Sequence, residues 1–176
     1  MKEEEPLRIP FELLLEIRCL HYETTHERKA VRAIAEKDGR FLMVTNKLGD
    51  YKFPGGGLDA TERPMDAVSR EVLEETGCAF TPSRFLLRTT ERRPDIMKDN
   101  ARFEMTSHYY VGHLEEGRGA QKLEPYEEAL GFEPVFMTLS EAFERNRSLL
   151  EKKSVINSWV RREMRVMEML LKMDKI

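Results

Sequence analysis

The chain has 176 residues, 40% of them hydrophobic and 35% charged, which suits one domain with its own core and excludes two ordinary domains. Its formal net charge is only −3, with acidic and basic residues interspersed, so we expect neither a surface that coats a nucleic-acid polymer nor one that binds a membrane. The N-terminus is charged, no stretch reaches the roughly 20 apolar residues that span a bilayer, and Cys19 and Cys78 form no CxxC pair, which together predict a reduced, cytoplasmic protein.

Residues 1–27 form an N-terminal extension that we expect to pack on the domain. Apolar and polar residues alternate between Phe11 and Leu15, which indicates a short strand, although Leu14 interrupts the pattern. From Arg28 the pattern becomes regular. Apolar runs at 30–35 and 41–44 predict two strands, the Asp-Gly pair between them predicts a hairpin turn, and a short extended segment follows at 51–53.

The next segment, Pro-Gly-Gly-Gly at 54–57, cannot form regular structure. Consecutive glycines permit backbone angles that are closed to other residues and let another group approach the main chain closely. Pro64 suits the first turn of a helix, and Asp66 complements the positive end of the helix dipole. Gly77 is typical of the left-handed residue that ends a helix. The sequence therefore predicts a helix from about Pro64 to Thr76.

The second half of the chain continues with strands and ends with helices. Strands are predicted at 80–90, 103–114 and 134–139, separated by a polar loop at 91–101 and a charged connection at 115–131. Apolar residues at helical spacing follow from Leu139, and residues 151–176 are expected to form a C-terminal amphipathic helix. Its apolar stripe would either cover the domain's own sheet or meet a second subunit in a homodimer; the stripe consists of Ile156, Val160, Met164, Met167 and Leu171.

This order of elements predicts the fold class. Strands joined by short turns, one helix, more strands and then helices favour an α+β protein, arranged as an α/β/α sandwich around a mixed sheet with extra C-terminal helices.

The helix at 64–76 carries the residues most suggestive of chemistry. Glu71, Glu74 and Glu75 are spaced i, i+3 and i+4, so their carboxylates project from one face, while Val68 and Val72 lie on the adjacent, packing face. Like charges at this spacing destabilise a helix, and a hard divalent cation such as Mg²⁺ or Mn²⁺ would offset the repulsion. Taken alone, such a triplet is more often a solvated acidic face; the adjacent glycine turn raises the odds of a metal or phosphate site.

The spacing across this region resembles a known motif. Gly56, five residues, Glu62, seven residues and then Arg70-Glu71-Val72-Leu73-Glu74-Glu75-Thr76-Gly77 is similar to the Nudix box, and 51–55 resembles the aromatic-x-x-Pro-Gly segment that precedes it. The chain departs from the motif at two positions. The family usually has a glycine where this chain has Thr61, and a bulky aliphatic residue where it has Cys78. We expect Cys78 to lie in the core. We place the Nudix hydrolase domain at residues 28–150.

The resemblance implies roles for individual residues. Glu71, Glu74 and Glu75 would hold Mg²⁺ or Mn²⁺ with the backbone carbonyl of Gly56. One carboxylate would act as general base, either Glu71 or a glutamate from a later loop. The candidates from the later loop are Glu133, Glu127 and Glu128. Arg70 would pair with Glu62 and orient the metal ligands. The candidate substrate contacts are Tyr51, Phe53, Gly55 and Gly56.

Three functions remain open at this point. The resemblance implies a pyrophosphohydrolase that cleaves a phosphoanhydride bond in a small nucleoside diphosphate derivative by attack of water at phosphorus. The alternatives are a Nudix-like ligand-sensing domain without turnover, which the intact Arg70 and glutamates argue against, and a prenyl diphosphate isomerase. The isomerase would require a catalytic cysteine, and neither Cys19 nor Cys78 lies in a recognisable motif for one. The choice among nucleotide substrates depends on loops that the box does not specify.

Overall fold

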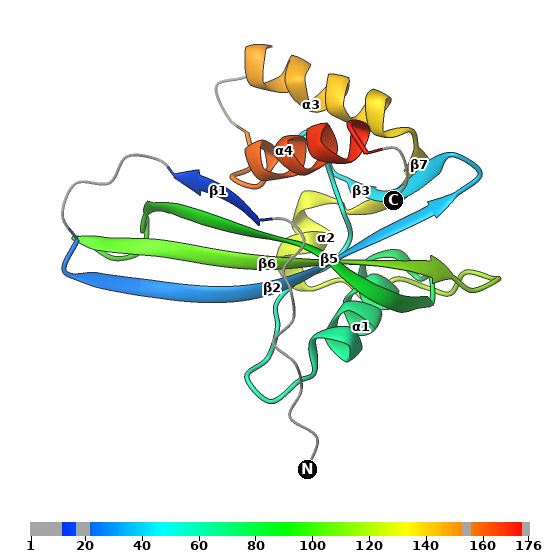
Figure 1. Ribbon diagram of the computed structural model, residues 1–176, viewed down its shortest axis with the longest axis horizontal. Helices are drawn as coiled ribbons and strands as arrows, with labels where there is room; N and C mark the ends of the chain where they lie inside the picture. Colours follow the sequence, from blue (N-terminus) through cyan, green and yellow to red (C-terminus); the bar gives the residue numbers. More distant parts are fainter. Residues whose placement is uncertain (1–11, 17–21, 153–155, 174–176) are drawn as a thin grey trace.

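A computed structural model describes residues 12–16, 22–152 and 156–173, which form three layers with a mixed sheet in the middle (Figure 1). Helix α1 lies on one face of the sheet, and helices α3 and α4 lie on the other. The strands are β1 (Glu12–Glu16), β2 (Thr24–Lys37), β3 (Arg40–Thr45), β4 (Tyr51–Lys52), β5 (Phe80–Pro94), β6 (Ala101–Leu114) and β7 (Glu133–Met137). The helices are α1 (Pro64–Thr76), α2 (Pro125–Leu130), α3 (Leu139–Lys152) and α4 (Val160–Leu171).

The sheet has the strand order β1-β5-β6-β2-β3-β4, with β7 paired to β3. Parallel pairs (β1 with β5, β2 with β6) and antiparallel pairs (β5 with β6, β3 with its three neighbours) occur together, which makes the sheet mixed. Asp38 and Gly39 join β2 to β3 and both have positive φ, as the tightest hairpin turns require. The first six residues of β2 are exposed and the next six buried, because only the later half of the strand lies between the helix layers.

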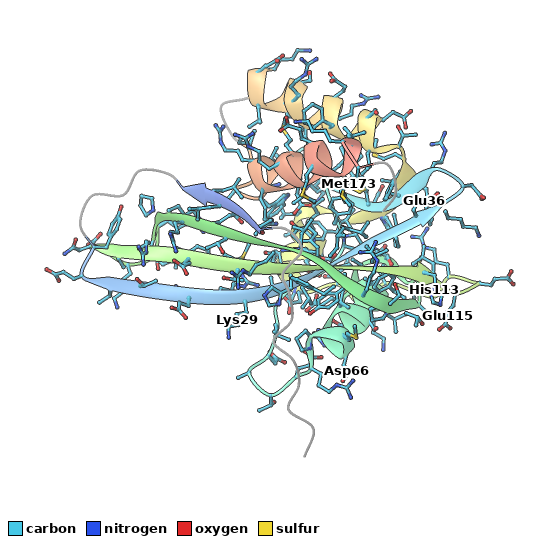
Figure 2. The ribbon with its side chains drawn as sticks, viewed as in Figure 1. Lys29, Glu36, Asp66, His113, Glu115 and Met173 are labelled. Atoms are coloured by element: carbon cyan, nitrogen blue, oxygen red, sulfur yellow. The ribbon has the colours of Figure 1, made fainter. Side chains whose placement is uncertain are left out.

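Two apolar cores fill the spaces on the two faces of the sheet, and side chains crowd both spaces (Figure 2). The core beneath α1 joins the helix to β2 and β6 and includes Val31, Ala33, Val68, Val72, Cys78 and Tyr110. The core beneath α3 and α4 includes Ile34, Met43, Phe53, Leu87, Tyr109, Ala142, Val166, Met167 and Leu170. Each core therefore fixes one helix layer against the same central strands.

The predicted fold class, the central strands, the hairpin turn and the helix from Pro64 to Thr76 are confirmed. Three local predictions were wrong. Strand β5 runs on to Pro94, because residues 91–94 pair with β6, so the predicted loop is shorter. The connection predicted at 115–131 contains α2. On α4 the predicted stripe is correct at Val160 and Met167, which are fully buried, but wrong at Leu171, which is exposed, and it omits the fully buried Arg162 and Glu163. No helix among the described residues has the length and apolar character to cross a membrane.

Candidate active site

Helix α1 is positioned by its ends and by its apolar face. Pro64 occupies the first turn, and Gly77 adopts a left-handed conformation with its N–H bonded to the carbonyl of Leu73 at 2.8 Å. Val68 and Val72 are fully buried against the sheet. The neighbouring face is thereby turned toward the glycine turn at residues 54–57.

The glycine turn is bonded to the central strand β2. Val31 donates its N–H to the carbonyl of Gly56 at 3.0 Å, and Ala33 donates to that of Pro54 at 2.9 Å. Gly55 has a φ of +139°, and a Cβ there would come 2.1 Å from the carbonyl oxygen of Val31, so no side chain fits. A Cβ on Gly56 would lie 2.2 Å from Oε2 of Glu71. The Glu71 carboxylate thus packs directly against the turn.

Arg70 connects the turn to the glutamates of α1. It makes a two-point ion pair with Glu62, at 2.9 and 2.8 Å, and its Nη1 donates to Glu71 at 2.9 Å and to Glu74 at 3.0 Å. The predicted pairing of Glu62 with Arg70 is confirmed. Because one guanidinium holds all three acids, Arg70 fixes the orientation of Glu71 and Glu74 and relieves part of their mutual repulsion.

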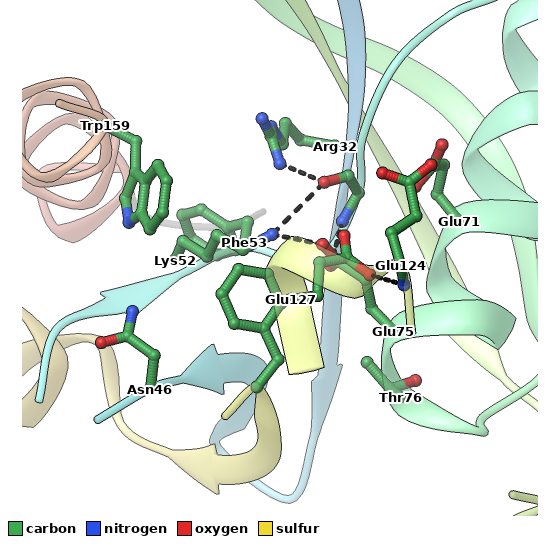
Figure 3. Close-up of polar contacts among 12 residues, drawn as sticks. Arg32, Asn46, Lys52, Phe53, Glu71, Glu75, Thr76, Glu124, Glu127 and Trp159 are labelled. Carbon is green, nitrogen blue, oxygen red and sulfur yellow. Dashed lines mark hydrogen bonds and ion pairs between the residues drawn. The ribbon is translucent and has the colours of Figure 1, made fainter. Parts of the chain in front are cut away.

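The third glutamate of the helix, Glu75, is buried at the centre of the site (Figure 3). It is ion-paired with Lys52 of β4 and accepts the N–H of Gly55 at 2.8 Å. Lys52 also lies over the ring of Phe132, 4.7 Å from its centre. Burial raises the pKa of Glu75 and lowers that of Lys52, and their attraction opposes both shifts.

Glu71 has the most perturbed titration of the partly accessible acids. Its side chain is 12% exposed, and this burial raises its pKa to about 7 against the opposing hydrogen bond from Arg70. The charges of Glu75 and Glu74 raise the pKa further. A cation bound beside this carboxylate would favour its ionised form and so lower its raised pKa.

In the described part of the chain, no three acidic, histidine or cysteine side chains converge on one point. The three glutamates instead stand along one helix face, each neutralised by Arg70 or Lys52. All the donors are carboxylate oxygens, and the nearby carbonyl of Gly56 has a second lone pair beyond its bond to Val31. This donor set suits a hard divalent cation such as Mg²⁺ rather than zinc.

Two adjoining cavities meet at Gly56. The first, of about 430 Å³, is mainly polar and lies between α1 and the start of α2, with Glu71, Arg70, Glu124 and Glu127 in its walls. The second, of about 160 Å³, shares Arg28, Gly56 and Tyr126 with the first. Its walls are aromatic and basic and include Phe103, Tyr126, Phe132, Trp159, Arg32, Lys52 and Arg93.

Arg32 is one of the buried basic residues that line the second cavity. It comes from the buried half of β2, is 7% exposed, and donates from Nη1 to the carbonyl of Gly55. Its Nε has no hydrogen-bond partner within the described residues. An unpaired buried donor is costly, so a ligand oxygen at this point would remove a penalty as well as add a bond.

Several predicted site residues are not brought to these cavities. Phe53 is fully buried in the core beneath α4, and Tyr51 packs against the same core with its backbone bonded to Asn146. Both therefore serve the fold where substrate contacts were expected. Glu133 is exposed, pairs with Thr45 at the start of β7 and lines neither cavity. Gly55 and Gly56 do line them.

The sequence reasoning missed Arg32, Lys52, Glu124 and the role of Trp159. Glu124 could have been found from α2, because Pro125 at its first position and Gly131 at its end are ordinary helix signals. Arg32 and Lys52 lie within apolar strand segments, and nothing local indicates that they face one cavity. The contribution of Trp159 depends on how the C-terminal segment folds back on the sheet.

A comparison with protein families decides the relationship: the NUDIX domain model matches residues 26–158. The chain belongs to the NUDIX family. Its glycine turn and α1 form the NUDIX box of the motif described above, which includes Glu62, Arg70 and the three glutamates. Helix α4 follows the region that the family model covers.

Individual relatives are more distant. A 56-residue segment is 39% identical to the ADP-ribose pyrophosphatase of Methanocaldococcus jannaschii. The matched segment covers 30% of this chain and 33% of that protein. A NUDIX hydrolase from Nitrosomonas europaea is 19% identical, with a TM-score of 0.58 over 84% of this chain and 91% of the other. The MutT protein of Bacillus halodurans is 15% identical, with a TM-score of 0.53 over 85% of each chain. The two structural likenesses show a shared NUDIX fold.

Proposed function

We propose that this NUDIX protein is a divalent-metal-dependent pyrophosphohydrolase that cleaves a phosphoanhydride bond in a nucleoside diphosphate derivative. The observation that carries the proposal is the meeting of two unlike cavities at Gly56. One presents the Glu71 carboxylate, with its pKa raised to about 7, and the other presents basic and aromatic side chains. A nucleoside diphosphate derivative has the matching parts: a ring that stacks and phosphates that need both a metal and cationic side chains.

Glu71, Glu74 and Glu75 would hold Mg²⁺ or Mn²⁺ together with the carbonyl of Gly56, and the bound ion would neutralise phosphate oxygens and lower the pKa of water. Arg70 keeps Glu71 and Glu74 oriented. The guanidinium of Arg32, with its unpaired Nε, would bind a phosphate oxygen in the second cavity.

Aromatic side chains would bind the nucleoside. Phe132 and Trp159 meet edge to face at 6.2 Å between ring centres, and Phe132 meets Tyr126 in the same way. Phe103 also lines the cavity, and Arg93 lies above its ring, 4.2 Å from the ring centre. Stacking is tolerant of the identity of the base, so these walls support a nucleotide without selecting one.

For the general base we propose Glu124 in place of Glu133. Glu124 immediately precedes α2, is exposed to water and lines the first cavity together with Glu71 (Figure 3). Its neighbour Glu127 is less suited because it is buried and already accepts hydrogen bonds from the Tyr126 hydroxyl and the Glu124 N–H, each at 2.9 Å. An exposed carboxylate in the wall of this cavity could take the proton of the attacking water.

The test is a phosphate-release screen with Mg²⁺ over nucleoside triphosphates, nucleotide sugars, dinucleoside polyphosphates and ADP-ribose, the last prompted by the name of the archaeal relative. Inorganic pyrophosphatase would reveal pyrophosphate released from the triphosphates, and phosphatase would reveal the terminal phosphates that cleavage exposes in the other compounds. We expect turnover of at least one compound and a loss of about 100-fold in Glu71→Gln, the scale for removing a group that stabilises the transition state. Asp66→Asn, an exposed acid on the same helix, is the matched control and should retain activity. Equal activity in wild type and Glu71→Gln would reject the site.

A further inference from the structure

Helix α4 buries two opposite charges side by side. Arg162 and Glu163 are both 0% exposed, while the rest of the buried face is mainly apolar and includes Val160, Val166 and Met167. A buried ion pair is commonly no more stabilising than a well-packed apolar pair of similar size, because both ions lose their hydration. Packing of the helix therefore does not explain why these two residues are charged.

Glu163 bonds to the segment that leads into the glycine turn. Its Oε2 accepts the backbone N–H of Phe53 at 3.0 Å. Phe53 stands directly between Lys52, which is ion-paired with Glu75, and Pro54, where the turn begins. The bond to Glu163 thus fixes the backbone at the point from which Lys52 reaches the acid.

Arg162 and Tyr109 hold Glu163 in place. Its Oε1 accepts hydrogen bonds from the Tyr109 hydroxyl at 3.1 Å and from Nη2 of Arg162 at 2.9 Å. Arg162 extends further, donating from Nε to the Tyr109 hydroxyl at 3.1 Å and from Nη1 to Glu91 of β5. The carboxylate that grips Phe53 is therefore tied to two strands of the central sheet.

A second contact holds the other end of the same segment. Asp50 accepts the indole N–H of Trp159 at 2.7 Å and the side-chain N–H of Asn157 at 2.6 Å. Residues 157–163 therefore hydrogen-bond to both ends of the segment 50–53. Of the three residues that make these bonds, Trp159 and Glu163 lie beyond the matched family region, which ends at residue 158.

We propose that Arg162 and Glu163 are a positioning pair for the metal site: they fix Phe53, and through it Lys52 and Glu75, in the arrangement that binds the divalent cation. The proposal rests on the proposed function, because Glu75 matters here as a metal ligand. Glu163 lines neither cavity, whereas Arg162 also forms part of the wall of the second cavity. The positioning effect of the pair passes through the hydrogen bond between Glu163 and the backbone N–H of Phe53.

The test compares two double variants that remove both charges and differ only at residue 163, in whether a hydrogen-bond acceptor remains for the Phe53 N–H and the Tyr109 hydroxyl. Arg162→Met with Glu163→Leu removes the acceptor of the Phe53 N–H, whereas Arg162→Met with Glu163→Gln keeps an oxygen at that place. Both double variants remove Arg162 and the Glu163 charge together but leave Glu91 without its ion-pair partner, so we expect both to fold with thermal midpoints lowered by a similar amount. Mn²⁺ affinity would be measured by electron paramagnetic resonance, beside kcat and KM with Mg²⁺.

We expect the leucine variant to bind Mn²⁺ about 10-fold more weakly, the scale found when a residue behind a metal ligand is removed, and kcat to fall while KM changes little. The glutamine variant should recover most of both losses. A leucine variant with wild-type Mn²⁺ affinity and kcat would overturn the proposal, as would a glutamine variant that recovers nothing. Wild type that neither binds Mn²⁺ nor turns over any compound would instead overturn the proposed function itself.

A third variant covers the case in which the leucine variant does not fold. Glu163→Asp keeps the charge and the pairing partner for Arg162 but withdraws the carboxylate by one methylene from Phe53. We expect normal folding, faster hydrogen exchange at the Phe53 N–H and weaker Mn²⁺ binding. Unchanged exchange and unchanged Mn²⁺ affinity would contradict the positioning role.

Discussion

At the scale of single residues, the three glutamates of α1 are chemically unlike one another although the sequence presents them as one acidic face. Glu75 is fully buried and neutralised by Lys52, whereas Glu74 is 37% exposed and held by Arg70. Glu71 lies between these extremes, with its pKa raised to about 7 by burial. It also packs against Gly56 in the first cavity, so it is the acid that both a cation and a phosphate could approach.

The choice of general base is also decided by position rather than by residue type. Replacing Glu124 by glutamine should lower kcat by about 100-fold, since proton transfer by a placed side chain contributes on that scale, while thermal stability stays unchanged because the residue is exposed. Glu133→Gln is the matched control, being an exposed glutamate nearby in sequence that lines neither cavity. Steady-state kinetics with the substrate from the screen would measure both. A larger loss in Glu133→Gln than in Glu124→Gln would return the role to Glu133.

At the scale of elements, the glycine turn and α1 act as one unit. Substitutions at two adjacent glycines of the turn should distinguish effects on activity from effects on stability. Gly56→Ala would place a methyl group 2.2 Å from Oε2 of Glu71, the far end of a side chain, which can move aside if it gives up its present position beside Arg70. We expect little change in the free energy of unfolding but a loss of activity of about 100-fold, because the displaced carboxylate no longer meets the metal and substrate. Thermal unfolding and kcat measured on the same protein would show this separation.

Gly57→Ala serves as the control for that variant. A Cβ at Gly57 meets only Nη2 of Arg28, at 3.8 Å, which is an ordinary contact. Its stability and most of its activity should therefore persist. If Gly57→Ala lost as much activity as Gly56→Ala, the effect would arise from stiffening the turn, and the contact between Gly56 and Glu71 would not be its cause.

The same unit shows which parts of the site the sequence could predict. Local features were sufficient for α1, since Pro64, Gly77 and the i, i+3, i+4 spacing of the acids act within a few residues of each other. Phe103 and Phe132 could be suspected, from their residue type, of stacking on a base, but local features could not predict that they share one cavity with Arg32 and Trp159, because the four residues come from separate segments. The predicted stripe on α4 is right only in part for a related reason: apolar periodicity finds the buried Met167 but cannot reveal that a buried Arg162 and Glu163 satisfy each other and a backbone N–H.

At the scale of the whole molecule, the two cores support different parts of the site from the two faces of the sheet. The core beneath α1 supports the NUDIX box, and the core beneath α3 and α4 contains Phe53 and Tyr109, the residues that connect α4 to the site. Helix α4 lies outside the matched family region yet contributes Val166, Met167 and Leu170 to this second core. It should therefore be required for the stability of the folded domain as well as for the site.

Two adjacent leucines at the end of α4 test this requirement. Leu170 is 1% exposed within the second core, whereas Leu171 is 45% exposed. Leu170→Ala should lower the free energy of unfolding by about 2–5 kcal/mol, through lost transfer energy and the cavity left behind, and Leu171→Ala should change it by less than about 0.5 kcal/mol. Urea unfolding monitored by the fluorescence of Trp159, the single tryptophan of the chain, would measure both.

The same measurement distinguishes a helix that covers its own sheet from one that meets a second subunit. If α4 packs within its own chain, the midpoint of unfolding is independent of protein concentration, because folding involves one molecule. If the helix were exchanged between two copies, the midpoint would rise with concentration, since association stabilises the folded form by mass action. A concentration-dependent midpoint that Leu171→Ala lowers as much as Leu170→Ala would contradict the packing of α4 described above, because it would require Leu171 to be buried as well.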